Sequence, residues 1–147
     1  MGVNVDVLFN NAGIATPNHP NDPALASSAR DMMACMQTNL IGVMHMSQKF
    51  LPLLEGGART IVNMSSVVAS IHNTFGCQGA MGNRLCYRTS KCAVNMLSRT
   101  LAAELDGRKY KVIAISPGHV STEMGTSGGR TAPLTIDMSC EGMLKVI

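Results

Sequence analysis

Three short apolar segments rich in β-branched residues alternate with longer segments of helical character along the chain. The apolar segments are residues 5–9, 60–64 and 111–115, and each is followed by polar or glycine-rich residues. Short apolar runs with such boundaries are typical of buried strands. The pattern therefore predicts three strands, each ending in a loop that carries polar groups.

The segments that follow these strands are predicted to be helical. Residues 24–54 are mostly good helix formers, and the polar pair Thr38-Asn39 together with Gly42 predicts two helices or one interrupted helix. Residues 86–105 place apolar side chains at helical spacing, which predicts one long amphipathic helix. A last helix is predicted to begin near Thr135.

The alternation of strands and helices favours an α/β fold. Strands joined by helical crossovers are parallel, so we expect a three-layer α/β/α sandwich of the Rossmann type in a single domain, residues 1–147. In such sheets ligands bind at the carboxyl ends of the strands. The segments that follow those ends are Asn10-Asn11-Ala12-Gly13, Ser65-Ser66 and Ser116-Pro117-Gly118. The topology therefore gathers chemically useful groups on one edge.

Two long segments lie outside these elements. Residues 67–85, with Gly76, Gly79 and Gly82, are predicted to be a long surface loop. Residues 119–133 form a second loop that is rich in Gly, Ser and Thr. A loop as long as the first is uncommon unless it serves a function.

Composition excludes several classes of protein. The chain has 147 residues, 46% of them hydrophobic, so it fits one globular domain that needs neither a metal nor a disulfide to fold. The formal charge of +3 is too small for the basic surface of a nucleic-acid binder. No apolar run approaches the length of a membrane span. The 12 methionines are predicted to fill the core.

Cysteine and histidine spacing indicates the compartment and disfavours a metal site. The cysteines are odd in number and contain no CxxC pair, which argues against a disulfide framework and a zinc site: Cys35, Cys77, Cys86, Cys92 and Cys140. The histidines show no ligand spacing either. The first residues lack the pattern of a secretory signal. We therefore expect a cytoplasmic protein without a bound metal.

Tyr87 and Lys91 are the first candidates for chemistry. They are four residues apart at the start of the predicted helix 86–105, which places both side chains on one helix face, one turn apart. An ammonium group beside a phenol favours the phenolate and lowers the tyrosine pKa, which makes the tyrosine a usable acid or base. A solvated helix face shows the same spacing more often, so the pair by itself leaves both interpretations open.

The pair belongs to a set of motifs that resembles the short-chain dehydrogenase/reductase family. Four of the family's blocks occur in the family's order: Asn10-Asn11-Ala12-Gly13, Asn39 within Thr38-Asn39-Leu40-Ile41-Gly42, Ser65-Ser66, and Tyr87-Arg88-Thr89-Ser90-Lys91. The segment Pro117-Gly118-His119-Val120-Ser121-Thr122 is similar to a fifth. Within the family, the chain looks most like the carbonyl reductases of the sniffer and C-factor type.

The resemblance implies an oxidoreductase that transfers a hydride between a nicotinamide cofactor and a carbonyl or alcohol carbon. Tyr87 would be the general acid during reduction. Lys91 would hold the nicotinamide ribose and lower the Tyr87 pKa. Ser66 would hydrogen-bond the substrate oxygen and stabilise its developing charge. Asn39 would interrupt its helix and help to position a water of the proton relay.

The resemblance also implies the cofactor, which is NADP or NAD with NADP favoured, and the residues that bind it. These residues are Asn11, Ala12, Gly13, Tyr87, Lys91, Pro117, Gly118, Val120 and Thr122. The substrate would be a small carbonyl or alcohol compound. A full-length relative would form a homo-oligomer, and neither nucleic acid nor a membrane is an expected partner.

Several assignments have structural alternatives. Ser65 or Ser70 could replace Ser66 as the catalytic serine, because the interval from Ser66 to Tyr87 is longer than usual in the family. Asn39 could cap a helix instead. The residues Asn11, Gly13 and Pro117 to Thr122 could form ordinary turns. His119, beside the implied nicotinamide site, is a further candidate for contact with substrate.

One motif of the family is missing from the sequence. A complete member opens with a strand and a glycine-rich GxxxGxG turn, which binds the cofactor pyrophosphate at a helix N-terminus. No such motif occurs in the 147 residues. The resemblance therefore implies a partial domain that begins at about the fourth strand of the family's sheet. The alternative function is a catalytically silent fragment that acts, if at all, through subunit association.

Overall fold

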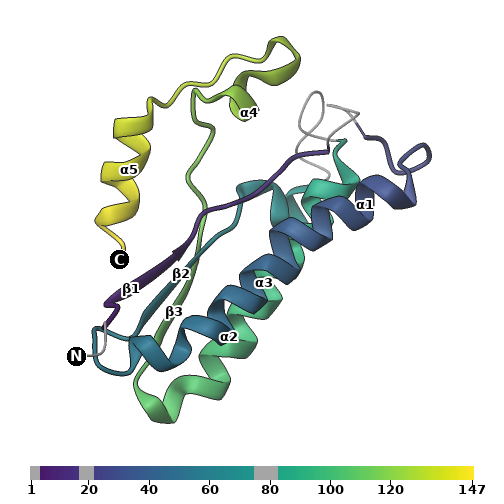
Figure 1. Cartoon of the computed structure of the whole chain (residues 1–147). Coiled ribbons are helices and arrows are strands. Elements are labelled where there is room, and N and C mark those ends of the chain that lie inside the picture. The colour runs from purple at the N-terminus through teal and green to yellow at the C-terminus, as the bar shows by residue number, and fades with distance from the viewer. Residues whose placement is uncertain (1–3, 17–21, 75–82) are drawn as a thin grey trace.

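The chain folds into a parallel sheet with helices on both faces (Figure 1). The computed structural model describes residues 4–16, 22–74 and 83–147. The strands are β1 (Val7–Asn10), β2 (Thr60–Met64) and β3 (Lys111–Ile115). The α-helices are α1 (Ala29–Met36), α2 (Val43–Leu54), α3 (Leu85–Leu105), α4 (Glu123–Thr126) and α5 (Ile136–Leu144).

The described strands form one sheet in the order β1-β2-β3, and both pairs are parallel. Leu8 of β1 lies beside Ile61 of β2, which lies beside Val112 of β3. Figure 1 shows α1, α2 and α3 on one face of this sheet and α5 on the other. The predicted three-layer α/β fold with parallel strands is therefore confirmed.

The core is divided between the two faces of the sheet, because side chains alternate along a strand. Between the sheet and α2 and α3 lie the buried residues Leu8, Leu54, Ile61, Leu105 and Tyr110. On the opposite face Val62, Met64 and Ile115 are buried, with Met143 and Ile147 packed against them. The last helix thus covers the second face of the sheet through its apolar residues.

The first strand begins later than predicted, at Val7 instead of Val5. The Val5 amide donates to Leu53 O at 3.0 Å, and Asp6 Oδ1 accepts from the Ala58 amide at 3.1 Å. These two residues are therefore fixed against the end of α2 and the turn after it. The strands predicted at 60–64 and 111–115 are confirmed with the same bounds.

The predicted helix 24–54 begins at Ala29, because the residues before it form a turn and a cap. The amides of Ala26 and Ser27 donate to Pro23 O, and Ser28 Oγ then accepts from the Asp31 amide at 3.0 Å. The predicted interruption is confirmed as a π-helical turn over Gln37–Gly42. The predicted last helix is confirmed, with Thr135 as its N-cap.

The two predicted loops contain short helical elements. The described part of the first loop holds 3₁₀ turns at Val67–Ala69 and His72–Thr74, and Gly76, Gly79 and Gly82 lie outside the described residues. The second loop contains α4 and a 3₁₀ turn at Ser127–Gly129. A further 3₁₀ turn, Asp106–Arg108, follows α3. The length of the loops was predictable, whereas these single turns carry no periodic signal.

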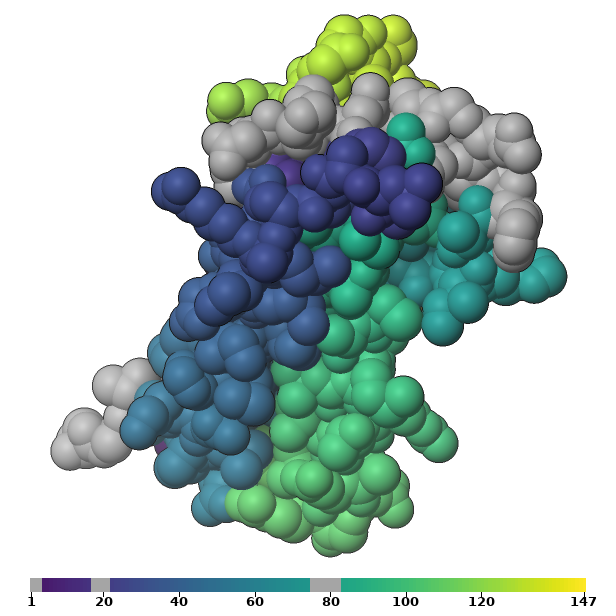
Figure 2. All heavy atoms as spheres, turned by 90° about the vertical axis from the view of Figure 1, so that its right-hand side faces the viewer, coloured from purple at the N-terminus to yellow at the C-terminus, as the bar shows by residue number. Residues whose placement is uncertain are grey.

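The prediction that the methionines fill the core is wrong for many of them. Met64 is buried, but large fractions of other methionine side chains are exposed: Met33, Met46, Met96, Met124 and Met138. The first three lie on helices of the layer that Figure 2 shows from its outer side, where α1 and α2 lie beside α3. A helix in an outer layer buries the face that packs on the sheet and leaves its opposite face exposed to solvent.

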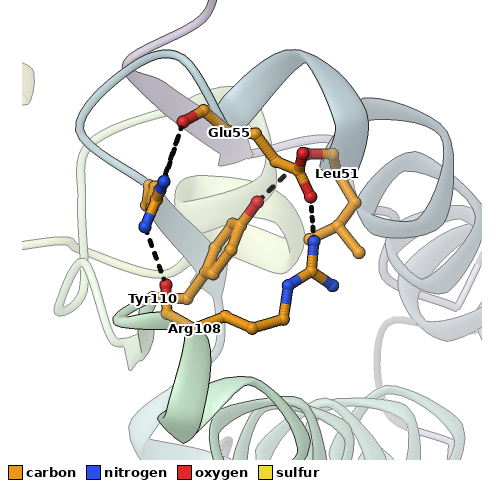
Figure 3. A network of polar contacts seen from close by, with 5 residues as sticks. Leu51, Glu55, Arg108 and Tyr110 are labelled. Atoms are coloured by element: carbon orange, nitrogen blue, oxygen red, sulfur yellow. Dashed lines mark hydrogen bonds and ion pairs between the residues drawn. The ribbon is translucent and has the colours of Figure 1, made fainter.

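A polar network lies at the end of the sheet where the strands begin (Figure 3). Arg59 donates from Nε to Glu55 O at 3.2 Å and from Nη1 to Arg108 O at 3.1 Å. Arg108 forms an ion pair with Glu55. The Tyr110 hydroxyl donates to Leu51 O at 3.1 Å, which joins the start of β3 to α2.

Tyr110→Phe tests the contribution of this network to stability. The substitution keeps the buried ring and removes one hydrogen bond, so we expect the free energy of unfolding to fall by about 1 kcal/mol. Denaturation by urea, followed by circular dichroism, measures the change. An unchanged midpoint would show that Leu51 O finds water instead.

Candidate active site

Tyr87 and Lys91 lie in the first turns of α3, beside the carboxyl end of β2. Lys91 Nζ donates to the carbonyl oxygen of Met64, the last residue of β2, at 2.7 Å. The same nitrogen lies 5.8 Å from the centroid of the Tyr87 ring. Lys91 is only 2% exposed. The pair is therefore not the solvated helix face that its spacing left open.

Burial dominates the electrostatics of this pair. Removal from water lowers the pKa of the Lys91 ammonium to about 8. Burial also raises the pKa of the Tyr87 phenol, while a hydrogen bond with Ser66 opposes the rise and the Cys35 thiol adds to it. The Tyr87 pKa is therefore raised and not lowered as expected, because desolvation of the phenol is the largest cause of its shift.

Of the three candidate serines, Ser66 is the one that the structure brings to Tyr87. Its hydroxyl is near enough to the phenol to lower the Tyr87 pKa, and it accepts from the Val68 amide at 3.4 Å. Ser65 Oγ instead donates to Asn95 Oδ1 at 2.5 Å, toward the middle of α3. Ser70 Oγ accepts from the Asn73 amide at 3.3 Å. The geometry therefore favours Ser66 over both alternatives.

Asn39 lies inside the π-helical turn and is fully buried, so it does not cap a helix. Its Nδ2 donates to Ile14 O and to Ser90 Oγ, both at 2.9 Å, and its Oδ1 accepts from the Ile14 amide at 2.8 Å. The side chain thus joins the segment after β1 to α3 and has both amide hydrogens in use. Its expected role in placing a water stays a prediction.

Gly13 allows the segment after β1 to approach Lys91 closely. A Cβ at this position would lie 3.2 Å from Lys91 Nζ and 3.3 Å from Asn39 Oδ1. Both distances are tighter than ordinary van der Waals contact, so a side chain here would displace one neighbour. The adjacent residues Asn11 and Ala12 are exposed. At Gly13 the main chain, with no side chain, therefore lies beside the Lys91 ammonium.

The segment 117–122 follows β3 and is hydrogen-bonded to Leu134. Val120 and Leu134 form an isolated parallel bridge, and the Ser121 amide donates to Leu134 O at 2.8 Å. Gly118 has a φ of +78°, and a Cβ there would meet Leu134 Cδ1 at 2.5 Å, so the position requires glycine.

Polar side chains fix both ends of this segment. Ser116 Oγ accepts from the Val67 amide at 3.0 Å, which joins the end of β3 to the residue after Ser66. Thr122 caps α4, since its Oγ1 accepts from the Gly125 amide at 3.1 Å and keeps its own proton to donate. His119 Nε2 lies 2.8 Å from Gly125 O, so its ring is engaged in the same turn.

Two other kinds of feature, a metal-binding group and a membrane-spanning helix, are absent from the described residues. They contain no group of three or more His, Cys, Asp or Glu side chains placed to hold a metal ion. Among them, no helix combines the length and apolarity needed to cross a membrane. The cysteines that the structure describes are free thiols: Cys35, Cys86, Cys92 and Cys140.

Comparison with known sequences settles the family. The profile of the short chain dehydrogenase family matches residues 2–132. The chain belongs to the short-chain dehydrogenase family. The resemblance derived from the sequence motifs is thereby confirmed.

Two relatives are similar in sequence, and two solved structures are similar in fold. This short-chain dehydrogenase is 32% identical to C-signal of Myxococcus xanthus over 145 residues, which cover 97% of this chain and 80% of that protein. It is 33% identical to the short-chain dehydrogenase anuI of Penicillium roqueforti over 132 residues, 85% of this chain and 51% of that protein.

The two solved structures are carbonyl reductases, the type that the motifs resemble. The NADPH-bound carbonyl reductase from chicken fatty liver gives a TM-score of 0.84 at 34% identity and covers 99% of this chain. The carbonyl reductase Sniffer of D. melanogaster gives 0.83 at 31% identity and covers 98% of it. The chain of 147 residues spans 58% of the length of each of these two carbonyl reductases and about half the length of the Penicillium relative.

Sequence reasoning missed a buried polar network behind the site of this short-chain dehydrogenase. Asn10 Nδ2 donates to Asn63 Oδ1 at 2.8 Å and to Ser47 Oγ at 3.3 Å, and Asn63 Nδ2 donates to Ser98 Oγ at 2.8 Å. The network ties β1 and β2 to α2 and α3. Its signal was an asparagine in the middle of a buried strand, since a buried polar group requires partners.

Proposed function

We propose that this chain forms the catalytic part of an NAD(P)-dependent oxidoreductase, which reduces a carbonyl group or oxidises the corresponding alcohol. The observation that carries the proposal is the Tyr87 phenol next to the buried ammonium of Lys91, with Ser66 close enough to lower the phenol pKa against the effect of burial. These groups lie at the carboxyl ends of parallel strands, where such sheets bind ligands. Residues 1–147 then form part of one dinucleotide-binding and catalytic domain.

Tyr87 is the proton donor in the direction of reduction. Because burial raises its pKa, the phenol keeps its proton at neutral pH and donates it to the substrate oxygen as that oxygen gains negative charge. The Ser66 hydroxyl donates a hydrogen bond to the same oxygen and stabilises that charge. Lys91, with a pKa of about 8, is positively charged at neutral pH and favours the phenolate that is left.

The donors beside Gly13 fit a nicotinamide ribose. Lys91 Nζ carries three protons, and in the described part of the chain it makes one hydrogen bond, to Met64 O. The missing Cβ of Gly13 lets its backbone lie close to this ammonium. Lys91 and Tyr87 would hold the ribose hydroxyls, and the cofactor, when bound, supplies or accepts the hydride.

Further cofactor contacts are proposed for the segments after β1 and β3. The residues are Asn11, Ala12, Gly13, Pro117, Gly118, Val120 and Thr122. NADP is the favoured cofactor, since the chicken carbonyl reductase, at 34% identity, has NADPH bound. The proposed substrate is a small carbonyl or alcohol compound, and the proposed setting is the cytoplasm, in keeping with the free thiols.

Gly13→Ala tests the proposed ribose site. The added methyl group would crowd Lys91 Nζ and Asn39 Oδ1, so we expect about a tenfold or greater loss of affinity for NADPH. Gly107→Ala is the matched control, because a Cβ there meets nothing within 4 Å. Fluorescence titration measures both affinities. Equal affinity in the two variants would contradict the placement of the cofactor beside Gly13.

The proposed function is tested first by binding of NADPH and NADH to the 147-residue chain, measured by calorimetry. Saturable binding, together with carbonyl reduction that depends on Tyr87, supports it. A folded chain that binds neither cofactor contradicts the cofactor contacts proposed for these 147 residues.

Exposed apolar residues on β1 favour a second candidate function, association with another polypeptide. Val7 and Phe9 are 41% and 38% exposed, on the sheet face opposite to that of Leu8. In the described sheet β1 is also an edge strand, whose free backbone groups can pair with another chain. Sedimentation of the chain without cofactor separates the candidates, because a strictly monomeric chain contradicts association.

A further inference from the structure

The helix that carries Tyr87 and Lys91 begins without a cap from its own sequence. Arg84, at the N-cap position of α3, has a φ of 93° and a ψ of 49°, and its side chain makes no capping hydrogen bond. No acidic residue lies in the first turn. The first N–H groups of a helix have no acceptors within it, so a buried helix start needs acceptors from elsewhere.

Asp22, in the segment before α1, supplies these acceptors. Its main-chain oxygen accepts from the Arg84 amide at 3.0 Å and from the Leu85 amide at 3.1 Å. Its carboxylate Oδ2 accepts from the Cys86 amide at 2.7 Å, across 64 positions of sequence. A carboxylate here also lies at the positive end of the helix dipole. One residue therefore serves three successive amides at the start of α3.

Burial makes this contact difficult to replace. Asp22 is 1% exposed and Cys86 is fully buried. Water therefore cannot take the place of the carboxylate at the Cys86 amide. Burial, together with the neighbouring Asp22 carboxylate, raises the pKa of the Cys86 thiol to about 12. The amide and the thiol of Cys86 thus both lie against the same side chain.

We propose that Asp22 is a positioning residue for Tyr87, which it holds against Ser66 by fixing the first turn of α3. Tyr87 directly follows Cys86, so any rotation of this turn moves the phenol. Lys91, one turn further on, has its own anchor at Met64 O. The inference rests on the proposed function, in which Tyr87 is the proton donor. Loss of the Asp22 carboxylate is expected to disturb Tyr87 more than Lys91.

Amide hydrogen exchange of the unaltered chain, followed by NMR, is the first test. The amides of Leu85 and Cys86 are expected to exchange at least about tenfold more slowly than those of Ile136 and Asp137, at the start of α5. The latter two are exposed first-turn residues of a helix whose cap accepts from Met138. Equal exchange at the two helix starts would overturn the proposal, whatever the variants do.

The second test is the ionisation of Tyr87, followed by tyrosinate absorbance in a Tyr110→Phe background. The chain contains two tyrosines and no tryptophan, so the signal then comes from Tyr87. Asp22→Ala is expected to move its midpoint down toward the ordinary tyrosine value, because the phenol leaves its buried position. Asp22→Asn is expected to retain the parental midpoint, because an amide oxygen still accepts from Cys86.

Thr135→Ala is the control for a general loss of stability, since it removes the cap of α5 and does not touch α3. It is expected to leave the Tyr87 midpoint unchanged. An unchanged midpoint in Asp22→Ala, or an equal shift in Thr135→Ala, would overturn the positioning role. Both tests are made without cofactor. Full turnover by Tyr87→Phe would contradict the proposed function and leave the positioning result intact. Likewise, failure of the positioning tests would leave the proposed function intact.

Discussion

Tyr87→Phe is expected to reduce turnover of a carbonyl substrate by about 10²- to 10⁴-fold, the usual contribution of a positioned acid or base. The substitution removes the hydroxyl that is proposed to donate the proton and that lies near Ser66. The ring remains, so α3 keeps its packing. Lys91 is also unchanged, and cofactor affinity is expected to fall only slightly. Steady-state kcat at saturating cofactor, with parallel measurement of the cofactor Kd, separates the two effects.

Tyr110→Phe is the matched control for this experiment. It removes the other tyrosine hydroxyl of the chain, which bonds Leu51 O at the opposite end of the sheet. Its kcat is expected to equal that of the parent despite the lower stability. A Tyr87→Phe variant with parental kcat would exclude Tyr87 as the proton donor. A fall in kcat shared by both variants would instead indicate a general effect of destabilisation.

The fold was largely predictable because its periodic elements are driven by burial. The strands 60–64 and 111–115 have the predicted bounds, since β-branched apolar runs have few alternatives to a buried sheet. The start of α1 was not predictable from helix propensity. Residues 24–28 favour a helix by composition, but Pro23 O and Ser28 Oγ accept the local hydrogen bonds first.

The candidate site was predictable in its members and not in its geometry. The motifs named Tyr87, Lys91 and Ser66, and the structure places all three at the end of β2. Sequence could not show that Lys91 Nζ bonds Met64 O, or that burial raises the Tyr87 pKa. Both depend on how tightly the layers pack. The contact between Asp22 and Cys86 spans 64 positions and likewise has no local signal.

Lys91→Met is expected to abolish turnover and to stabilise the fold at neutral pH. Burial lowers the Lys91 pKa from 10.5 to about 8 in the folded chain. A difference of this size corresponds to roughly 3 kcal/mol of destabilisation at pH values where both states carry the proton. Loss of the bond to Met64 O offsets about 1 kcal/mol. The variant is therefore expected to gain about 2 kcal/mol in free energy of unfolding at pH 7.

The pH dependence of this gain identifies its cause. Between the folded pKa of about 8 and the unfolded value of 10.5, the unfolded chain binds more protons at Lys91 than the folded chain. The parent is therefore stabilised at this site as pH rises through that window, and the advantage of Lys91→Met shrinks. The buried groups Cys35, Cys86 and Tyr87 have raised pKa values and act in the opposite direction, but they are common to both proteins.

Chemical denaturation of parent and variant at several pH values between about 7 and 10 measures this difference and cancels the shared groups. Lys49→Met is the control, because Lys49 is exposed on α2 and its removal relieves no burial. A constant difference between Lys91→Met and the parent across this range would contradict a buried ammonium. A difference that narrows with pH would show that the fold holds a destabilising charge at the place where the proposed chemistry requires one.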